Sequence, residues 1–271
     1  MWAQSRRLAD SRSMKALALP ASLLGVGLLT LAATIYLMDG MISGPGAKLG
    51  QIGWFIGVWV LMMAAMMLPS VAPMALTFAR VTGERSKKGQ AAFVPTWIFI
   101  LGYFAAWTAF GLAAYAIDHF VRSLDIAWLA LDREGPMVTG VAIAAAGIYQ
   151  LTPFKRACLV HWRSPLDFFL ESWREGPGGA LLMGLHHGLY CVGCCWGLML
   201  VLFALGVMSL FWMAVIAVLI FSEKVLHVGP RLAPVIGAAL IAVGVWIAVA
   251  PASVPGLHLS EHKAGMPDMK M

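Results

Sequence analysis

The sequence predicts an all-α fold, a polytopic bundle of transmembrane helices with about seven spans. Of the 271 residues, 61% are hydrophobic and only 12% are charged, whereas an ordinary soluble domain carries about 25% charged residues. The hydrophobic residues form runs of the length that crosses a bilayer, about 20 residues each. The basic residues lie in short clusters between those runs, which is typical of the loops of a membrane protein.

Seven apolar runs predict the helices in order. They lie at about 16–38, 52–79, 92–117, 137–153, 180–207, 209–222 and 233–250. The first run is longer than the h-region of a signal peptide, about 7–15 residues, and no clear A-x-A site follows it, so we expect an uncleaved span. The predicted organisation is a cytoplasmic segment 1–15, a helical membrane domain 16–250 and an external tail 251–271.

The distribution of Lys and Arg predicts the orientation. Alternate segments, beginning with the N-terminal one, hold fourteen of these residues, and the opposite set holds five. Because basic loops stay in the cytoplasm, we expect the N-terminus inside and the C-terminus outside. The acidic stretch 118–136 then lies outside, and 154–178, which mixes aromatic and charged residues, is expected to lie in the headgroup plane.

The fifth run carries the strongest candidate site. Within ten residues it has His186, His187, Cys191, Cys194 and Cys195. On an α-helix, His187 and the three cysteines share one face over roughly two turns. Each residue alone is usually a packing residue, but so many polar groups at membrane depth indicate function. Imidazole and thiolate bind zinc and copper, and soft sulfur ligands favour Cu(I).

One straight helix cannot surround an ion, because His187 and Cys194 lie about 10 Å apart along its axis. The second run offers partners, since Met63, Met66 and Met67 share a face near its middle. Methionine more often only fills a core, although beside a Cys/His helix a thioether is a plausible soft ligand. We therefore predict a site between the second and fifth spans. Small residues are expected to let these two helices approach closely: Ala64, Ala65, Gly188, Gly193 and Gly197.

Two other groups are expected to lie apart from this site. Glu223 and Lys224 end the sixth run, and we interpret them as an ion pair at a cytoplasmic helix end that does not reach the middle of the bilayer. A role in gating or charge balance is the alternative.

The tail is either a solvated low-complexity segment or a place for metal capture by soft ligands. Its candidate ligands are His258, Glu261, His262, Met266, Met269 and Met271.

Several motifs follow one another between about residues 54 and 225. They are Trp59-x-x-Met62-x-x-Ala65-Met66-Met67-x-Pro69-Ser70, Lys155-x-x-Cys158-Leu159, Arg163-Ser164-Pro165, His187-Gly188, Cys191-Val192-Gly193-Cys194-Cys195-Trp196-x-Leu198-Met199, the stretch from Gly206-Val207-Met208 to Trp212-Met213, and Glu223-Lys224. In these the chain resembles a bacterial family of predicted metal-binding integral membrane proteins, of the domain of unknown function 2182 type.

The resemblance implies a metal site that involves Cys191, Cys194 and Cys195, with the second-span methionines beside them, and it implies no particular reaction. Members of that family often carry a second cysteine just after the position of His161, where this chain has Trp162. For that reason we leave Cys158 out of the main site. The His/Met tail lies outside the resemblance.

Three functions fit these residues. The first is copper handling, in which the protein binds Cu(I), with zinc as the alternative metal, and passes it to a membrane or periplasmic metalloprotein. The second is thiol–disulfide or quinone-linked redox chemistry, since Cys191 and Cys194 have the C-x-x-C spacing. The third is a structural subunit of a larger membrane complex.

We expect a multi-pass protein of the cell inner membrane whose partner is the lipid bilayer. No motif for a nucleotide or flavin, and no basic stripe for nucleic acid, is evident.

Overall fold

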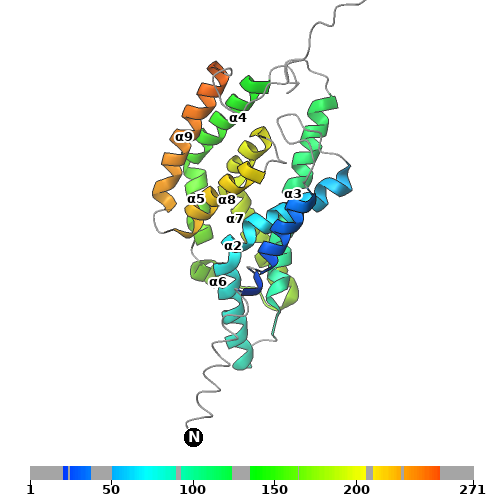
Figure 1. Ribbon diagram of the computed structural model, residues 1–271. Helices are drawn as coiled ribbons and strands as arrows, with labels where there is room; N and C mark the ends of the chain where they lie inside the picture. The colour runs from blue at the N-terminus through cyan, green and yellow to red at the C-terminus, as the bar shows by residue number, and fades with distance from the viewer. Residues whose placement is uncertain are drawn as a thin grey trace, which may run out of the picture.

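The computed structural model describes residues 21–23, 25–37, 51–89, 93–123, 135–163, 165–205, 210–226 and 229–250. Every regular element in these ranges is an α-helix, so the all-α prediction is confirmed (Figure 1). The segment 1–15 and the tail 251–271 lie outside the described residues.

The helices coincide with the seven predicted apolar runs. An apolar helix covers Ala21–Leu37. The labelled helices that follow are α2 (Ile52–Lys87), α3 (Thr96–Ser123), α4 (Gly135–Gln150), α5 (Pro153–Arg163), α6 (Pro165–Ser172), α7 (Gly176–Leu205), α8 (Leu210–Val225) and α9 (Gly229–Val249). Several boundaries differ from expectation. The helix α2 continues to Lys87, beyond its predicted end at 79. The helix α3 includes the beginning of the predicted external loop 118–136, and the segment 154–178 forms two short helices, α5 and α6.

Within the described ranges, four helices are long and apolar enough to cross a membrane: α2, α3, α7 and α9. A fifth span is present if α4 and α5, which meet at a bend of 62°, are counted together as one. The chain is therefore a multi-pass membrane protein. The helix α8, at 16 residues, is shorter than the four long helices.

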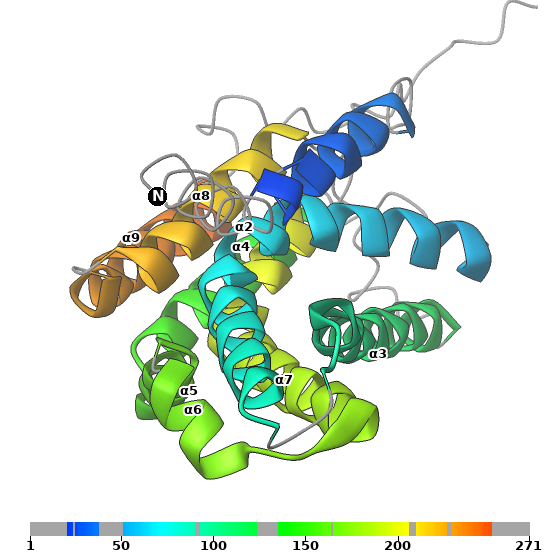
Figure 2. The same ribbon diagram turned by 90° about the horizontal axis from the view of Figure 1, so that it is seen from below.

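The helix α7 is the centre of the packing. It contacts α3, α4, α5 and α8, while α4 pairs along its length with α9. Figures 1 and 2 show α3 on one side of the bundle and the α4–α9 pair on the other. The backbones of α3 and α7 approach closely, because a Cβ atom at Gly184 would collide with the carbonyl of Phe99, and one at Gly102 with that of Leu181.

The expectation that small residues of α7 admit the second span was wrong. Gly188 faces α3, Gly193 faces α5 and Gly197 faces α4. The helix α2 instead packs on α3 and α8, and it meets α7 through large side chains. Trp59, for example, stacks on Phe203 with ring centroids 5.6 Å apart. The bulky buried face of α2 therefore keeps its backbone away from α7, and other helices use the glycines.

Two prolines interrupt the hydrogen bonding of α2. Pro69 and Pro73 lie inside this 36-residue helix, and the ribbon changes direction partway along it (Figures 1 and 2). Proline bends a helix because it has no N–H to donate and its ring crowds the preceding turn. Ser70 makes a local bond there, its hydroxyl donating to the carbonyl oxygen of Met67 at 3.0 Å. The bend thus lies beside the methionine-rich segment.

Candidate metal centre

Three cysteine sulfurs come together on α7. Cys191, Cys194 and Cys195 are 0%, 1% and 1% exposed, and their Sγ atoms all lie within 4.8 Å of one another. The spacing i, i+3, i+4 produces this local cluster, since residues three and four apart are neighbours on a helix face. Three thiols at this separation are close enough to ligate one soft ion after small side-chain rotations, because metal–sulfur bonds are about 2.3 Å long.

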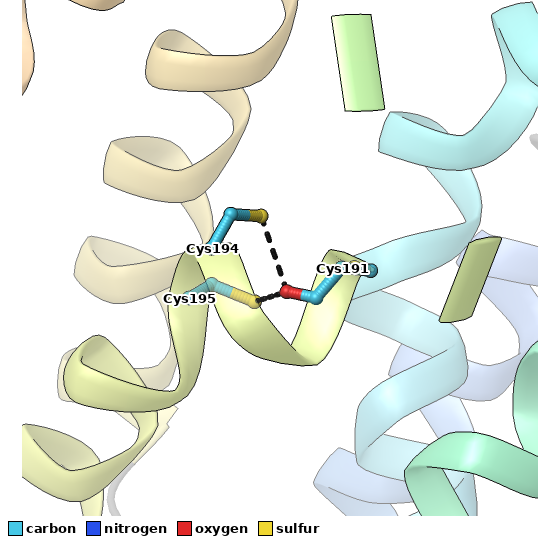
Figure 3. A group of neighbouring side chains, drawn as sticks. All are labelled: Cys191, Cys194 and Cys195. Carbon is cyan, nitrogen blue, oxygen red and sulfur yellow. Dashed lines mark hydrogen bonds between the residues drawn. The ribbon is translucent and has the colours of Figure 1, made fainter. Parts of the chain in front are cut away.

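The three sulfurs have different hydrogen-bonding roles. The thiols of Cys194 and Cys195 both donate to the carbonyl oxygen of Cys191, at 3.1 and 2.8 Å (Figure 3). The sulfur of Cys191 instead meets two polar groups from other helices. Lys224 Nζ of α8 donates to it at 2.7 Å, and the hydroxyl of Tyr103 on α3 lies 2.9 Å away. Cys191 is thus the sulfur that faces positive charge.

Lys224 lies at the centre, where the sequence interpretation did not place it. We expected the Glu223 end of the sixth run to stay clear of the cysteines, and that expectation was wrong. The reason is helix length. Lys224 lies fourteen residues beyond Leu210, and Cys191 lies fourteen residues before Leu205. At 1.5 Å per residue both are about 21 Å from the α7–α8 connection. The short α8 therefore ends level with the cysteines, and its length was the available signal.

Several helices surround the Lys224 ammonium group. Its Nζ lies 3.9 Å from Cys195 Sγ on α7 and 4.0 Å from Met67 Sδ on α2. It also lies over the indole ring of Trp162 on α5, 4.7 Å from the centroid, a cation–π contact. The expectation that one helix alone cannot form the centre agrees with this arrangement, in which α2, α3, α5 and α8 all contribute groups around the cysteines of α7.

Met67 is the second-span methionine placed beside the centre. Its sulfur lies 4.0 Å from Lys224 Nζ, and the sulfur of Cys191 lies 2.7 Å from the same nitrogen. The distance between the two sulfurs is therefore no more than the sum of these two distances. Met63 and Met66 are buried in the same core, 0% and 5% exposed. A role for these two as ligands stays a prediction.

His187 lies one turn before Cys191 in an aromatic environment. It is fully buried, at 0% exposure. Its ring stacks on Trp162 with centroids 5.5 Å apart and meets the edge of Phe168 at 5.4 Å. Within the described part of the chain, neither ring nitrogen has a hydrogen-bonding partner. A buried imidazole without partners is costly, which indicates that a ligand or a rearrangement satisfies it.

Two other residues lie apart from the sulfurs. His186 is exposed on α7 and packs against Tyr190, with centroids 4.9 Å apart. Cys158 of α5 is buried beside Gly193, and the group of three sulfurs found among the described residues does not include it. The structure therefore brings Cys191, Cys194 and Cys195 together, and it places His186 elsewhere.

A second polar group lies next to the centre on α8. Glu223, 2% exposed, pairs with Lys155 of α5, 1% exposed, at 2.6 Å, and accepts a hydrogen bond from Gln150 Nε2 at 3.0 Å. Its backbone carbonyl accepts a bond from Arg163 at 2.7 Å. Glu223 and Lys224 therefore do not form the ion pair with each other that we expected. Adjacent on the last turn of α8, Glu223 pairs with Lys155 of α5, whereas Lys224 donates to Cys191 of α7.

The chemistry of the centre is that of a soft-cation site. It offers three thiol sulfurs and a nearby thioether, with no carboxylate in the sulfur group. Such ligands favour Cu(I), and they bind Zn(II) as well. The enclosure of the centre among five helices excludes water, which strengthens every electrostatic interaction inside it.

Comparison with known proteins agrees with this chemistry. No curated protein and no solved structure matches the chain. A family model described as PpoB2, copper chaperone, matches residues 56–247. The matched region runs from within α2 to within α9 and includes the three cysteines and Lys224. Because this region makes up well over half of the sequence, the chain belongs to the PpoB2 copper chaperone family.

Proposed function

We propose that Cys191, Cys194 and Cys195 bind one Cu(I) ion, which this membrane protein of the copper chaperone family then delivers to a client. The single observation that carries the proposal is the cluster of three buried sulfurs within 4.8 Å on α7. Packing alone does not require three thiols there, since any small apolar residue fills such space. Soft thiolates at that spacing match the preference of Cu(I).

The other candidate residues assist the three cysteines in binding copper, each in a different way. Met67 supplies a thioether at the edge of the centre, because its sulfur already contacts the same ammonium group as Cys191. His187 supplies an imidazole once its ring turns, as its nitrogens have no partner within the described residues. Met63 and Met66 extend the soft surface along α2. His186, being exposed, is suited to a transient contact during entry.

Copper titration of the purified, reduced protein tests the proposal. Cu(I) should bind at one equivalent in the membrane domain and more tightly than Zn(II), because sulfur ligands and an enclosed site favour the softer, monovalent ion. Replacing all three cysteines by Ser should abolish this equivalent. Cys158→Ser is the matched control, since it removes a buried thiol outside the sulfur group. Retention of copper by the triple variant would refute the site.

We further propose seven spans with a cytoplasmic N-terminus in the cell inner membrane. The count takes Ala21–Leu37, α4 and α8 as spans besides the four long helices, and it leaves α5 and α6 at the membrane surface. Loop charge supports the orientation, with fourteen basic residues against five. The client is then a membrane or periplasmic metalloprotein. The resemblance to the predicted metal-binding family of the domain of unknown function 2182 type covers nearly the same region and supports the same assignment.

A further inference from the structure

The ammonium group of Lys224 lies in the position of a bound cation. Its Nζ contacts Cys191 Sγ at 2.7 Å and lies 3.9 Å from Cys195 Sγ. The thioether of Met67 lies 4.0 Å away on another side. These are the groups that a Cu(I) ion between α7 and α2 would contact. The side chain is only 3% exposed, so its ammonium group is surrounded by these sulfurs and the Trp162 ring rather than by water.

A metal ion and this ammonium group exclude each other. The nitrogen is already at hydrogen-bond distance from Cys191 Sγ, and a Cu(I) bonded to that sulfur and to its neighbours would lie against the same nitrogen. Two positive charges a few ångströms apart in a buried site repel strongly, because the effective dielectric constant there is far below that of water. One of them has to leave.

We propose that Lys224 is an internal counter-cation, which occupies the sulfur centre when it is empty, is displaced when Cu(I) binds, and promotes release by returning. The proposal rests on the copper site proposed above. The displaced ammonium group keeps a partner, because the Trp162 ring already lies 4.7 Å from it. This cation–π contact continues to stabilise the charge after the sulfur contacts are lost. No electron moves in the exchange. Cu(I) keeps its charge, the ammonium keeps its protons, and each thiol that bonds to copper releases its proton to the medium.

Neighbouring contacts limit how the displacement occurs. Glu223, the adjacent residue, is fixed by Lys155 and Gln150, and its carbonyl by Arg163. The backbone of α8 at Glu223 is thus held in place, so the Lys224 side chain and the residues that follow it at the end of α8 are what change between the empty and loaded states. Copper occupancy is thereby connected to the conformation of the α8 end.

The test measures Cu(I) release to a chelator in excess. Lys224→Gln keeps a donor of similar reach but removes the charge, and it should release Cu(I) about tenfold or more slowly, since the competitor for the sulfur is gone. Lys224→Arg keeps a cation beside the sulfurs and should therefore release Cu(I) faster than Lys224→Gln. Lys87→Gln, an exposed lysine paired with Glu84, is the matched control for loss of one positive charge.

The sign of the effect separates this role from the alternative. A lysine that only stabilised the sulfur anion would strengthen copper binding, so its removal would give faster release. Unchanged or faster release from a Lys224→Gln protein that still binds one Cu(I) at the three cysteines overturns the proposal. If wild type binds no cysteine-dependent Cu(I), the proposed function itself fails, which is a different result.

A measurement on the unsubstituted protein does not depend on any variant folding. Hydrogen–deuterium exchange at the residues after Glu223, including the Leu226 amide that donates to the Ser222 carbonyl, should be faster in the Cu(I)-loaded protein than in the empty protein, because the end of α8 loses the bond from Lys224 to Cys191. Equal or slower exchange in the loaded protein contradicts displacement.

Discussion

Glu223 and Lys155 form an ion pair in which each charge depends on the other, with side chains 2% and 1% exposed. Removing one partner leaves a buried charge without compensation, which typically costs about 3–5 kcal/mol. We therefore expect Glu223→Gln to lower the free energy of unfolding by about 3 kcal/mol. The double variant Lys155→Met with Glu223→Gln should recover most of that loss. Unfolding in detergent provides the measurement, and equal losses in both variants would contradict a compensated pair.

His187 separates packing from ligation. Its ring fills an aromatic environment formed with Trp162 and Phe168, so His187→Phe, which keeps an aromatic ring of somewhat larger size, should change the unfolding temperature little. If the imidazole assists metal binding, the same variant should weaken Cu(I) affinity by about tenfold, the lower end of the effect of groups that support a metal site. A competition titration measures it. Undiminished affinity would make His187 a packing residue.

At the residue scale, the sequence predicted what is local and missed what is tertiary. Cys191, Cys194 and Cys195 were identified because their spacing alone places them on one helix face. Lys224 and Tyr103 come from other helices, and nothing in their immediate sequence refers to the cysteines. The lengths of α7 and α8 predict that Lys224 lies at the same depth in the bundle as the cysteines. Which face of α8 turns toward the cysteines follows only from the packing.

Among the helices, the close contact of α3 with α7 is the most sensitive to substitution. A Cβ atom at Gly184 would collide with the backbone of Phe99, whereas Gly57 on α2 has nothing within 4 Å. Gly184→Ala should destabilise the protein by about 1–3 kcal/mol through overpacking. Gly57→Ala is the control, expected to be neutral or stabilising by up to about 1 kcal/mol. Equal effects of the two substitutions would contradict the contact.

The positions of the helices could be predicted from hydrophobic runs, but their partners could not. Each apolar run coincides with a helix, because a run of that length in lipid has to satisfy its backbone internally. Which helix each glycine faces depends on the whole arrangement. Gly188, Gly193 and Gly197 allow close approach of α3, α5 and α4, respectively. We had expected α2 at these glycines, because the prediction did not take into account that large side chains on the buried face of α2 prevent a close approach.

For the whole molecule, orientation in the membrane is the open prediction. A reporter that is active only outside the cytoplasm should be active when fused after residue 271 and inactive when fused at Lys87, because the segments on the Lys87 side carry most of the basic residues. Activity levels in whole cells measure this. A cytoplasmic C-terminus would remove one span from the count and place the tail on the other side.

In the whole molecule, the metal chemistry could be predicted from the sequence, but the arrangement around it could not. Composition and loop charge indicated a membrane protein, and the chemistry of the cysteines indicated a soft metal, in agreement with the copper chaperone family that matches residues 56–247. The arrangement of Lys224, Met67 and Trp162 around those cysteines required the structure, since these residues lie on α8, α2 and α5 and are far apart in the sequence.

X-ray absorption at the copper edge identifies the atoms that are bonded to the copper ion. The Cu(I)-loaded protein should show sulfur ligands at about 2.3 Å, near the length of zinc–sulfur bonds, and this sulfur shell should disappear when Cys191, Cys194 and Cys195 are replaced by Ser. The Cys158→Ser protein should give the wild-type spectrum. A spectrum dominated by nitrogen or oxygen ligands, or a sulfur shell that persists in the triple variant, would contradict copper binding by the sulfurs of α7.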